Sequence, residues 1–210
     1  MEQASGNDII QDGMGAPSLV LKRITDVVCA LVGLVVLSPV FLVIMFLMKR
    51  QNNGSVFFRQ ERIGYGARPF TIYKFRTMSS VIEERGPQLI AKCDDTNSTR
   101  LEQFLRCHQL DELPQLWNVL RGDMSLVGPR PERRFFIDKI MAHDADYEYI
   151  FKMRPGLTSE ATLYNGYTDT MDKMLRRLHM DISYYRRRSL WLDFTIVAKT
   201  VAGIVTGKKI

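Results

Sequence analysis

The chain has 210 residues, a mass of 24.2 kDa, a formal net charge of +6 and a pI near 9.3. This length accommodates a membrane segment and one globular domain, and no internal repeat is visible. The positive charge suits an anionic membrane surface or an anionic substrate. It does not indicate nucleic-acid binding, because the basic residues form neither an aromatic-interleaved sheet nor a recognition helix.

The first part of the chain combines a polar tail with an apolar run. Residues 1–18 are polar and contain glycines at positions 6, 13 and 15, a composition that predicts a mobile tail. Residues 27–48 carry no charge. A helix of that length can cross a hydrocarbon core of roughly 30 Å.

Two features of the apolar run argue against a simple crossing. Ser38 and Pro39 fall near its middle, where proline removes a helical hydrogen bond and clashes with the preceding turn. Basic residues flank both ends (Lys22, Arg23, Lys49 and Arg50), and basic flanks prefer the cytoplasmic side. We therefore predict that residues 19–50 form a re-entrant hairpin that bends at Ser38 and Pro39. Asp26 would pair with Lys22 or Arg23 near the headgroups, although a snorkelling interface is equally compatible with these charges.

Residues 51–210 are predicted to form a cytoplasmic domain that begins with a β-hairpin. Residues 56–60 and 70–75 have strand character and are joined by a glycine-containing turn. The hairpin would direct Arg62, Lys74 and Arg76 toward whatever the domain binds. A solvated basic face is the alternative for these three residues.

The rest of the domain is predicted to be mainly helical. A polar connection at 83–98 precedes helices at 101–107, 114–120 and 132–149, a loop at 153–165 and a helix at 169–188. The last segment has apolar residues at helical spacing (Leu190, Phe194, Val197, Val201 and Ile204 or Val205), with Trp191 at its start. This pattern suits a helix on a membrane surface or one packed on the core. The fold class is therefore α+β, mainly helical, with a re-entrant helix-break-helix, a small β-hairpin and C-terminal amphipathic helices at the membrane.

The block LDELPQLWNVLRGDMSLVGPRP, residues 110–131, carries the strongest chemical signal. Asp111 and Glu112 lie just before Pro114, and proline is tolerated in the first turn of a helix, so the pair should lie at a helix start. There the free backbone N–H groups favour anions, and an ionised carboxylate would serve as a nucleophile or a metal ligand. Arg130, between two prolines, suits a phosphate oxygen. Alternatively, Asp111 is only a helix cap.

The order and spacing of several pieces resemble those of the bacterial sugar transferases, the monotopic polyprenyl-phosphate phosphoglycosyl transferases, in their minimal form. The resemblance covers residues 18–208. The matching pieces are KRITD at 22–26, SP at 38–39, FRQERIG at 58–64, YKFRTM at 73–78, the block at 110–131, RPG at 154–156, and LD at 192–193.

The resemblance implies a reaction at the cytoplasmic face of the bacterial inner membrane. A sugar 1-phosphate would pass from a nucleoside diphosphate sugar, most simply a uridine diphosphate sugar, to polyprenyl (undecaprenyl) phosphate through a covalent intermediate. This step would initiate assembly of a glycan such as an exopolysaccharide, capsule, O-antigen or glycoprotein. Membrane lipids, a second copy of the chain and downstream glycosyltransferases are the further partners to consider.

The resemblance also implies roles for individual residues. Asp111 would be the nucleophile, and Glu112 would hold Mg²⁺. Metal ligation by Asp111 as well is compatible with these roles. Arg106, Arg130 and Asp193 match active-site positions of the family, with the arginines on phosphate oxygens and Asp193 supporting the metal or an arginine. Lys74 and Arg76 are expected to bind phosphate or substrate.

One loop departs from the family pattern. Where the family commonly has RPGITGWAQVNG, this chain has RPGLTSEATLYNG at 154–166, one residue longer and without the tryptophan. That loop would touch the sugar or the base, so the identity of the donor does not follow from the resemblance.

Two other functional classes remain compatible with the sequence. The first is a membrane-anchored, non-catalytic scaffold of a glycan-assembly complex, against which the intact carboxylate pair and Gly128-Pro129-Arg130-Pro131 turn argue. The second is a single-span membrane enzyme that acts on a soluble phosphorylated substrate.

Overall fold

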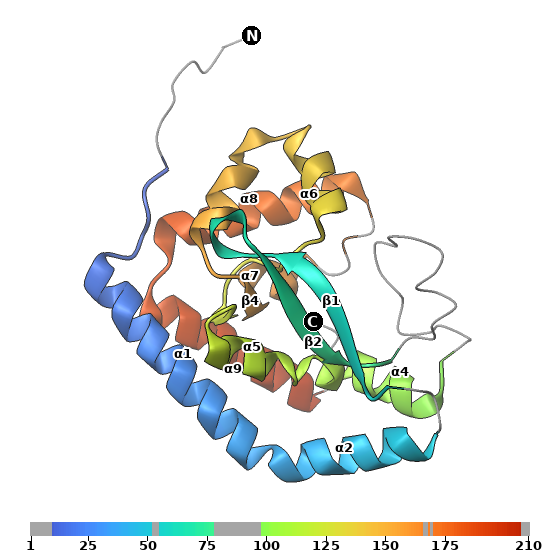
Figure 1. The fold of residues 1–210 in the computed structure, drawn as a ribbon. Coiled ribbons are helices and arrows are strands. Elements are labelled where there is room, and N and C mark those ends of the chain that lie inside the picture. The colour runs from blue at the N-terminus through green and yellow to red at the C-terminus, as the bar shows by residue number, and fades with distance from the viewer. Residues whose placement is uncertain (1–9, 52–54, 78–97, 166–167, 169, 207–210) are drawn as a thin grey trace.

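The computed structural model describes residues 10–51, 55–77, 98–165, 168 and 170–206 (Figure 1). These residues form a mainly helical α+β fold with a bent helix pair at the N-terminal end, a β-hairpin and further helices toward the C-terminus. The predicted fold class is thereby confirmed. The predicted polar connection at 83–98 lies outside the described residues, apart from Ser98.

The N-terminal helices α1 (Ala16–Val36) and α2 (Ser38–Arg50) are bent by 57° at Leu37. Pro39 lies in the first turn of α2, where the backbone N–H that proline lacks would have no helical acceptor. Ser38 donates its hydroxyl to the carbonyl of Val35 at 2.7 Å. The predicted break is therefore confirmed. In the described part of the chain no single helix has the length and apolarity to cross a bilayer, whereas α1 and α2 meet these criteria together.

Residues 10–15 pack on the end of helix α8 (Met171–Arg187). Ile10 and Met14 are buried, and the N–H of Gly13 donates to the carbonyl of Tyr185 at 3.0 Å. A Cβ on Gly13 would lie 2.7 Å from the carbonyl oxygen of Arg186, so the close contact requires glycine. Residues 10–18 therefore do not belong to a mobile tail as predicted, because these contacts fix residues 10–15 and α1 begins at Ala16. Residues 1–9 lie outside the described residues.

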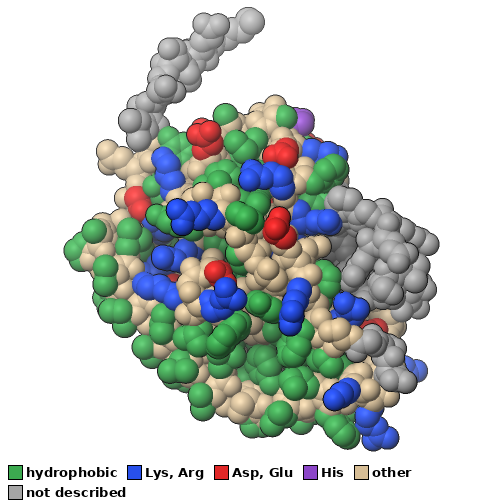
Figure 2. Space-filling model, in the orientation of Figure 1, with side chains coloured by type: hydrophobic (Ala, Val, Ile, Leu, Met, Phe, Trp, Pro, Cys, Tyr) green, Lys and Arg blue, Asp and Glu red, His purple; other side chains and the backbone are tan. Residues whose placement is uncertain are grey.

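Small residues on the inner face of α1 allow it to approach the domain closely. Ala30 is fully buried, and a Cβ on Gly33 would lie 3.2 Å from Cδ1 of Leu116 in helix α5 (Gln115–Arg121). On the outer face, large apolar side chains are exposed along both helices (Val20, Leu21, Ile24, Val28, Leu31, Val32, Val35, Val36, Val40, Leu42, Val43, Phe46 and Leu47). Figure 2 shows hydrophobic side chains along the edge formed by α1 and α2.

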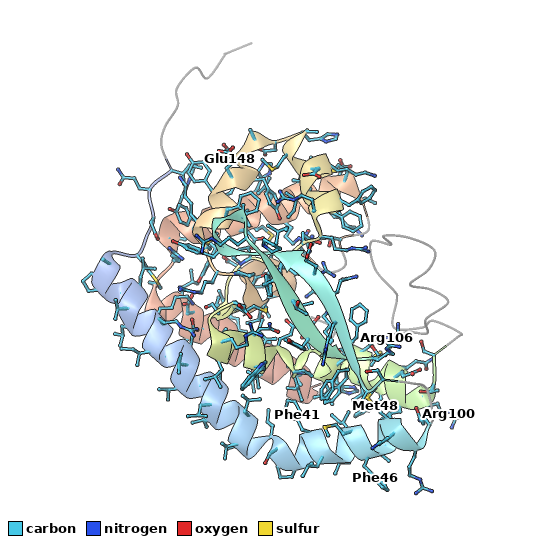
Figure 3. The ribbon with its side chains drawn as sticks, in the orientation of Figure 1. Phe41, Phe46, Met48, Arg100, Arg106 and Glu148 are labelled. Carbon is cyan, nitrogen blue, oxygen red and sulfur yellow. The ribbon has the colours of Figure 1, made fainter. Side chains whose placement is uncertain are left out.

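Helix α2 also has two distinct sides. Ile44 and Met48 are buried against Phe75 of the hairpin, and the ring of Phe41 lies 5.5 Å from that of Phe75. Figure 3 shows Phe41 and Met48 on the side of α2 that faces the domain and Phe46 on the opposite side. The bent pair is thus attached to the domain along one side only.

The β-hairpin consists of β1 (Phe57–Ile63) and β2 (Pro69–Phe75), which pair antiparallel with Gln60 opposite Ile72. The turn between them contains the 3₁₀ helix η1 (Tyr65–Ala67), and Gly66 has a φ of 65°, which glycine adopts at no steric cost. The predicted hairpin is confirmed, and its first strand extends three residues beyond the predicted end.

The remaining elements surround the hairpin. They are α4 (Arg100–Cys107), η2 (Leu110–Glu112), α5 (Gln115–Arg121), β3 (Ser125–Val127), α6 (Arg134–Met141), η3 (Ala145–Lys152), β4 (Gly156–Thr158), α7 (Glu160–Tyr164), α8 (Met171–Arg187) and α9 (Leu190–Thr206). Strands β3 and β4 pair in parallel, and the larger apolar core lies between β3, α6, η3, α8 and α9.

Two of the predicted segments differ from the structure. The single helix predicted at 132–149 is divided into α6 and η3, because Asp144 accepts a hydrogen bond from the N–H of Asp146 and begins a new helix. The loop predicted at 153–165 contains β4 and α7, and Ser159 caps α7 by accepting from the N–H of Thr162.

The apolar residues of α9 divide between two sides. Ile196 is buried in the core, with Leu192 and Val197 packed beside it. Phe194 and Trp191 are 62% and 75% exposed, and their rings stack at 5.6 Å. The predicted amphipathic face is therefore not a single core-facing stripe.

Candidate active site

The carboxylate pair lies in the short 3₁₀ helix η2, between α4 and α5. Gln109 precedes it in the left-handed region, with a φ of 54°, and turns the chain sharply after α4. Pro114 is the N-cap of α5, which agrees with the prediction that Asp111 and Glu112 precede a helix that begins near this proline. Leu110 and Leu113, on either side of the pair, pack with the cluster that contains Met48 of α2. The pair is therefore flanked by two side chains that belong to the same apolar cluster as α2.

Glu112 accepts hydrogen bonds from two basic side chains through one oxygen, Oε1. Lys74 of β2 donates from Nζ at 2.6 Å, and Arg130 donates from Nη2 at 2.8 Å. Three segments that are distant in the sequence thus meet at one carboxylate. The structure brings together four of the residues predicted from the sequence: Asp111, Glu112, Lys74 and Arg130.

The two carboxylates have different ionisation behaviour. Burial raises the pKa of Asp111 to about 6, Lys74 opposes this rise, and the adjacent Glu112 carboxylate adds to it. Burial acts in the same direction on Glu112, but Arg130 and Lys74 outweigh it and hold the pKa of Glu112 well below its usual range. Glu112 in turn raises the pKa of Arg130. Burial thus has the largest effect on the pKa of Asp111, whereas the two basic partners outweigh burial at Glu112.

The turn that carries Arg130 is held by strand β4. The carbonyl of Pro129 accepts from the N–H of Gly156 at 2.9 Å, and the backbone N–H of Ser125 donates to the carbonyl of Pro155 at 2.8 Å. A Cβ on Gly128 would lie 2.3 Å from the carbonyl oxygen of Arg154, so the two backbones approach too closely for any side chain. The RPG piece at 154–156 therefore supports the turn that presents Arg130.

A buried charge network lies immediately after Pro131. Glu132 accepts from Arg177 of α8 at 2.5 Å and lies 3.5 Å from Arg62 of β1. Arg62 also donates to the carbonyl of Pro131 at 3.2 Å. Arg62 thus fixes the turn rather than pointing to a ligand or to solvent as predicted. The neighbouring Asp181 is buried, and burial raises its pKa to about 7 despite the nearby Arg177.

Arg76 and Arg106 carry buried donors without a described acceptor. The Nε of Arg76 and the Nε and Nη1 of Arg106 have no hydrogen-bond partner among the described residues, while Nη2 of Arg106 donates to Ser98 at 2.5 Å. Figure 3 shows Arg106 near the end of the hairpin, on the side of α4 away from Arg100. An unpaired buried guanidinium N–H is costly, so these donors suit an anionic ligand such as a phosphate.

Asp193 belongs to a different cluster from the one predicted. Its Oδ2 accepts from Lys22 of α1 at 2.5 Å, and its Oδ1 accepts from the hydroxyl of Tyr184 at 2.5 Å. Asp26 is predicted to pair with Lys22 or Arg23 near the headgroups, but its distance to Lys22 is 4.0 Å. Its carboxylate instead accepts from the hydroxyl of Ser125 at 2.8 Å and from the N–H of Leu126 at 3.1 Å. These buried contacts attach α1 to β3, α8 and α9, and the sequence pattern gave no sign of them.

The residues at the pair fit a divalent cation that is shared with a substrate. No group of three or more Asp, Glu, His or Cys side chains capable of holding a metal occurs among the described residues. Asp111 and Glu112 nevertheless offer two adjacent carboxylates, and Mg²⁺ in nucleotide sites is commonly bound by one or two carboxylates together with substrate phosphates.

Comparison with known proteins identifies relatives over nearly the whole chain. The family described as bacterial sugar transferase matches residues 17–207. A UDP-N-acetylgalactosamine-undecaprenyl-phosphate N-acetylgalactosaminephosphotransferase of Aeromonas hydrophila is 41% identical over 187 residues, which cover 89% of this chain and 44% of the relative. A UDP-glucose:undecaprenyl-phosphate glucose-1-phosphate transferase of Caulobacter vibrioides is 42% identical over 188 residues, which cover 88% of this chain and 70% of the relative.

A second relative described as a UDP-glucose:undecaprenyl-phosphate glucose-1-phosphate transferase, from Escherichia coli, is 39% identical over 86% of this chain and 39% of the relative. The chain thus spans less than half the length of the Aeromonas and Escherichia relatives. The sugars in the names of these relatives differ, although the acceptor in those names is the same.

Proposed function

The chain belongs to the bacterial sugar transferase family, and we propose that it transfers a sugar 1-phosphate from a UDP-sugar to undecaprenyl phosphate through an aspartyl phosphosugar intermediate. The transfer would initiate assembly of a polysaccharide. The names of these relatives all contain undecaprenyl phosphate, which supports the proposed acceptor. They also all contain a UDP-sugar, which supports uridine diphosphate as the nucleotide part of the donor. The differing sugars among those names leave the sugar open.

The proposed reaction has two displacements at one phosphorus atom. The Asp111 carboxylate attacks the phosphorus next to the sugar, the phosphoanhydride bond breaks, and uridine monophosphate leaves with the bonding electron pair. An oxygen of undecaprenyl phosphate then attacks the same phosphorus and breaks its bond to Asp111. This step restores the carboxylate and forms the lipid diphosphate sugar.

The single observation that supports this division of labour is the unequal engagement of the two carboxylates. Oε1 of Glu112 accepts from both Lys74 and Arg130, so these contacts hold the Glu112 carboxylate in place and make it a poorer nucleophile than Asp111. Asp111 has a pKa of about 6, which leaves it mostly ionised near neutral pH and basic enough to attack. Lys74 and Arg130 would also stabilise the negative charge on the phosphorus oxygens during transfer.

We propose Mg²⁺ as the cofactor, held by Glu112 and Asp111 with the diphosphate of the donor. Mg²⁺ would neutralise the negative charge of the leaving nucleotide. Arg76 and Arg106, with their unpaired buried donors, would bind the remaining phosphate oxygens.

The site would operate at the cytoplasmic face of the membrane. Helices α1 and α2 expose large apolar side chains on their outer faces, and the inner face of α2 contacts the cluster around Leu110 and Leu113. Insertion of this bent pair would hold Asp111 at the level of lipid headgroups, where the phosphate of the acceptor lies. The exposed Trp191 and Phe194 of α9 would lie at the same interface.

Nucleotide release without the lipid acceptor tests the covalent intermediate. The purified chain is mixed with Mg²⁺ and each of a panel of UDP-sugars. We expect about one equivalent of uridine monophosphate per active site, after which release stops until undecaprenyl phosphate is added. Asp111→Asn should abolish this burst but still bind donor, whereas Glu112→Gln should slow turnover and shift its Mg²⁺ dependence. Asp138→Asn, on the exposed side of α6, is the control.

Two outcomes would contradict parts of the proposal. Release that requires the lipid from the first turnover would favour direct displacement and would make Asp111 a metal ligand. No release with any donor, with or without lipid, would favour the non-catalytic scaffold.

Accessibility labelling tests the membrane arrangement. Single cysteines at Ser18 and Gln51, in a background without native cysteines, report the two ends of the bent pair. Labelling of both positions from the same side supports re-entry, and labelling from opposite sides supports a single crossing.

A further inference from the structure

A cavity of 580 Å³ lies between the start of α1, the turn after β3, the end of η3 and the end of α8. Its volume is in the range of small-molecule sites, roughly 300–1,000 Å³. The described residues that line the cavity do not include Asp111, Glu112, Lys74 or Arg130. They do include Gly128, at the base of the turn that presents Arg130. The cavity is therefore separate from the proposed transfer site, although it borders the same turn.

Basic side chains outnumber acidic ones in the cavity wall. Five basic residues (Lys22, Arg23, Lys152, Arg154 and Arg188) face two carboxylates, Asp12 and Asp26. Arg188 pairs with Asp12, and Lys22 pairs with Asp193. Figure 2 shows Lys and Arg side chains gathered across the middle of the visible face.

The other three basic residues contact neutral groups. Arg23 donates to the carbonyls of Val119 and Leu120 at 2.8 and 3.1 Å, and Arg154 donates to the carbonyl of Gly122 at 3.1 Å. Lys152 lies 4.1 Å from the centre of the Tyr149 ring. These carbonyl and ring contacts leave the net positive charge in place, and no carboxylate of the described residues lies within 4.0 Å of these three cations.

The two guanidinium groups meet at the C-terminal end of α5, where they destabilise each other. Burial, followed by the positive charge of Arg154, lowers the pKa of Arg23, and the carboxylates Asp26 and Asp123 oppose this effect. The carbonyl end of the helix dipole partly compensates the two charges. An anion in the cavity would compensate them directly.

The position of the cavity on α1 indicates where such an anion would come from. Leu19, Lys22 and Arg23 line the cavity, while Val20, Leu21 and Ile24 in the same turns are at least half exposed. One side of these turns therefore faces a basic cavity, and the other side is apolar enough for the acyl region of a membrane. A phosphate attached to a lipid fits both requirements, because its chains would lie along the apolar side.

We propose that this cavity binds the phosphate group of an anionic phospholipid beside the start of α1. The choice of a lipid, rather than free phosphate, rests on the membrane orientation proposed above for α1. Binding would hold the first turns of α1 and the end of α8 at the headgroup level, and would thereby fix the height of the domain above the bilayer.

Native mass spectrometry of the full chain in detergent tests this site. The protein is titrated with phosphatidylglycerol, phosphatidylcholine or inorganic phosphate, and the bound fraction is measured. Lys152→Gln/Arg154→Gln removes two wall charges, and Arg134→Gln/Lys139→Gln removes two exposed charges from α6, outside the cavity wall. A basic residue near an anionic surface contributes about 1 kcal/mol to binding. Loss of two such residues in the first variant should therefore weaken the binding of phosphatidylglycerol about 30-fold. The α6 variant should bind it like the wild type.

Three results would overturn the proposal. The first is equal weakening in both double variants, which indicates diffuse attraction. The second is phosphatidylcholine binding as tightly as phosphatidylglycerol. The third is wild-type binding of inorganic phosphate, lost in the cavity variant, without binding of phosphatidylglycerol, which indicates a soluble anion.

Two measurements keep these outcomes interpretable. Thermal melting reports whether the double variant Lys152→Gln/Arg154→Gln folds. If that variant does not fold, the single variant Lys152→Gln, at an exposed residue, is used in its place. Nucleotide release is measured on the same preparations. A failure of lipid binding with an intact burst would leave the transferase proposal standing, because the carboxylate pair lies outside the cavity.

Discussion

Gly128 and Gly156 lie back to back, so that a Cβ on Gly156 would stand 2.2 Å from the amide nitrogen of Gly128. The contact joins β3 to β4 and fixes the start of the turn that presents Arg130 to Glu112. Two short pieces of sequence that are 28 positions apart thus form one support for the proposed active site.

Replacing Gly156 with alanine should damage activity and stability together. The added methyl group must displace backbone, which is costly because the neighbouring strand cannot move like a flexible side chain. We expect a loss of about 3 kcal/mol in the free energy of unfolding, measured by denaturant titration, and a large loss of turnover. Gly66→Ala, in the hairpin turn with open space around its Cα, is the control. It should cost only the strain of its positive φ, about 1 kcal/mol. Equal losses in the two variants would contradict the role assigned to the close approach.

The first-turnover rate of nucleotide release should fall as the pH is lowered through about 6. Asp111 has a raised pKa of about 6, and only its ionised form is a nucleophile, so protonation below that pH removes the reactive species. The rate should decrease about tenfold per pH unit below the pKa. Rapid-quench measurement of uridine monophosphate between pH 4.5 and 8 provides the profile.

The Glu112→Gln variant tests how the charge of Glu112 affects the pKa of Asp111. The negative charge of Glu112 raises the pKa of Asp111, so its removal should move the acidic limb of the profile to lower pH, even though turnover is slower. An acidic limb that stays at the same pH in Glu112→Gln would mean that another group titrates.

Asp193→Asn should act mainly on stability and on the attachment of α1. Asp193 and Lys22 are both about 8% exposed and lie 2.5 Å apart, so neutralising Asp193 leaves a buried ammonium whose remaining carboxylate, Asp26, is 4.0 Å away. Breaking such a pair typically costs about 3–5 kcal/mol. The melting temperature should fall, while the Mg²⁺ dependence of turnover in the surviving folded protein should stay unchanged.

The double variant Lys22→Met/Asp193→Leu is the matched test of that pair, because it removes both charges. It should recover much of the stability lost in Asp193→Asn. A shift in the Mg²⁺ dependence of Asp193→Asn would instead support the role that the sequence resemblance implies, which is support of the metal.

The sequence predicted those features that depend on local chemistry. The break at Ser38 and Pro39 follows from the covalent geometry of proline, and the hairpin follows from alternation around a glycine turn. Asp111 and Glu112 were found because two adjacent carboxylates before a helix are unusual enough to be noticed. The position of Arg130 between two prolines predicts a phosphate contact, and the hairpin pattern directs Lys74 toward a ligand. The structure places both side chains on Glu112.

The sequence did not predict features that depend on long-range packing. Lys22 meets Asp193 across 171 positions, and no local periodicity records such a pair. Glu132 and Arg177 form a buried pair in segments that each resemble an ordinary amphipathic helix. The helix predicted at 132–149 failed because helical periodicity continues across Asp144, whose capping contact ends it. The only sequence signal that Glu132 helps to hold the Pro129-Arg130-Pro131 turn was its position immediately after that turn.

Arg130→Lys should reduce turnover strongly although the charge is kept. The Nη2 of Arg130 lies 2.8 Å from Glu112, so the remaining edge of the planar guanidinium can reach a phosphate oxygen at the same time. An ammonium is a single point donor and cannot bridge the two groups with the same geometry. We expect a loss of about 100-fold or more in kcat, comparable with removing one stabilising donor at a transition state.

The measurement that separates this role from a structural one is the steady-state rate together with the melting temperature. Arg134→Lys, an exposed arginine four positions away, is the matched control and should leave both unchanged. Arg130→Lys should leave the melting temperature nearly unchanged, because Lys74 still pairs with Glu112, and should lower kcat more than it raises KM. Near-normal turnover would show that Arg130 serves only to hold the turn. A large fall in melting temperature with unaltered kcat would lead to the same conclusion, since a residue that stabilises the transferring phosphate must affect the rate in the folded enzyme.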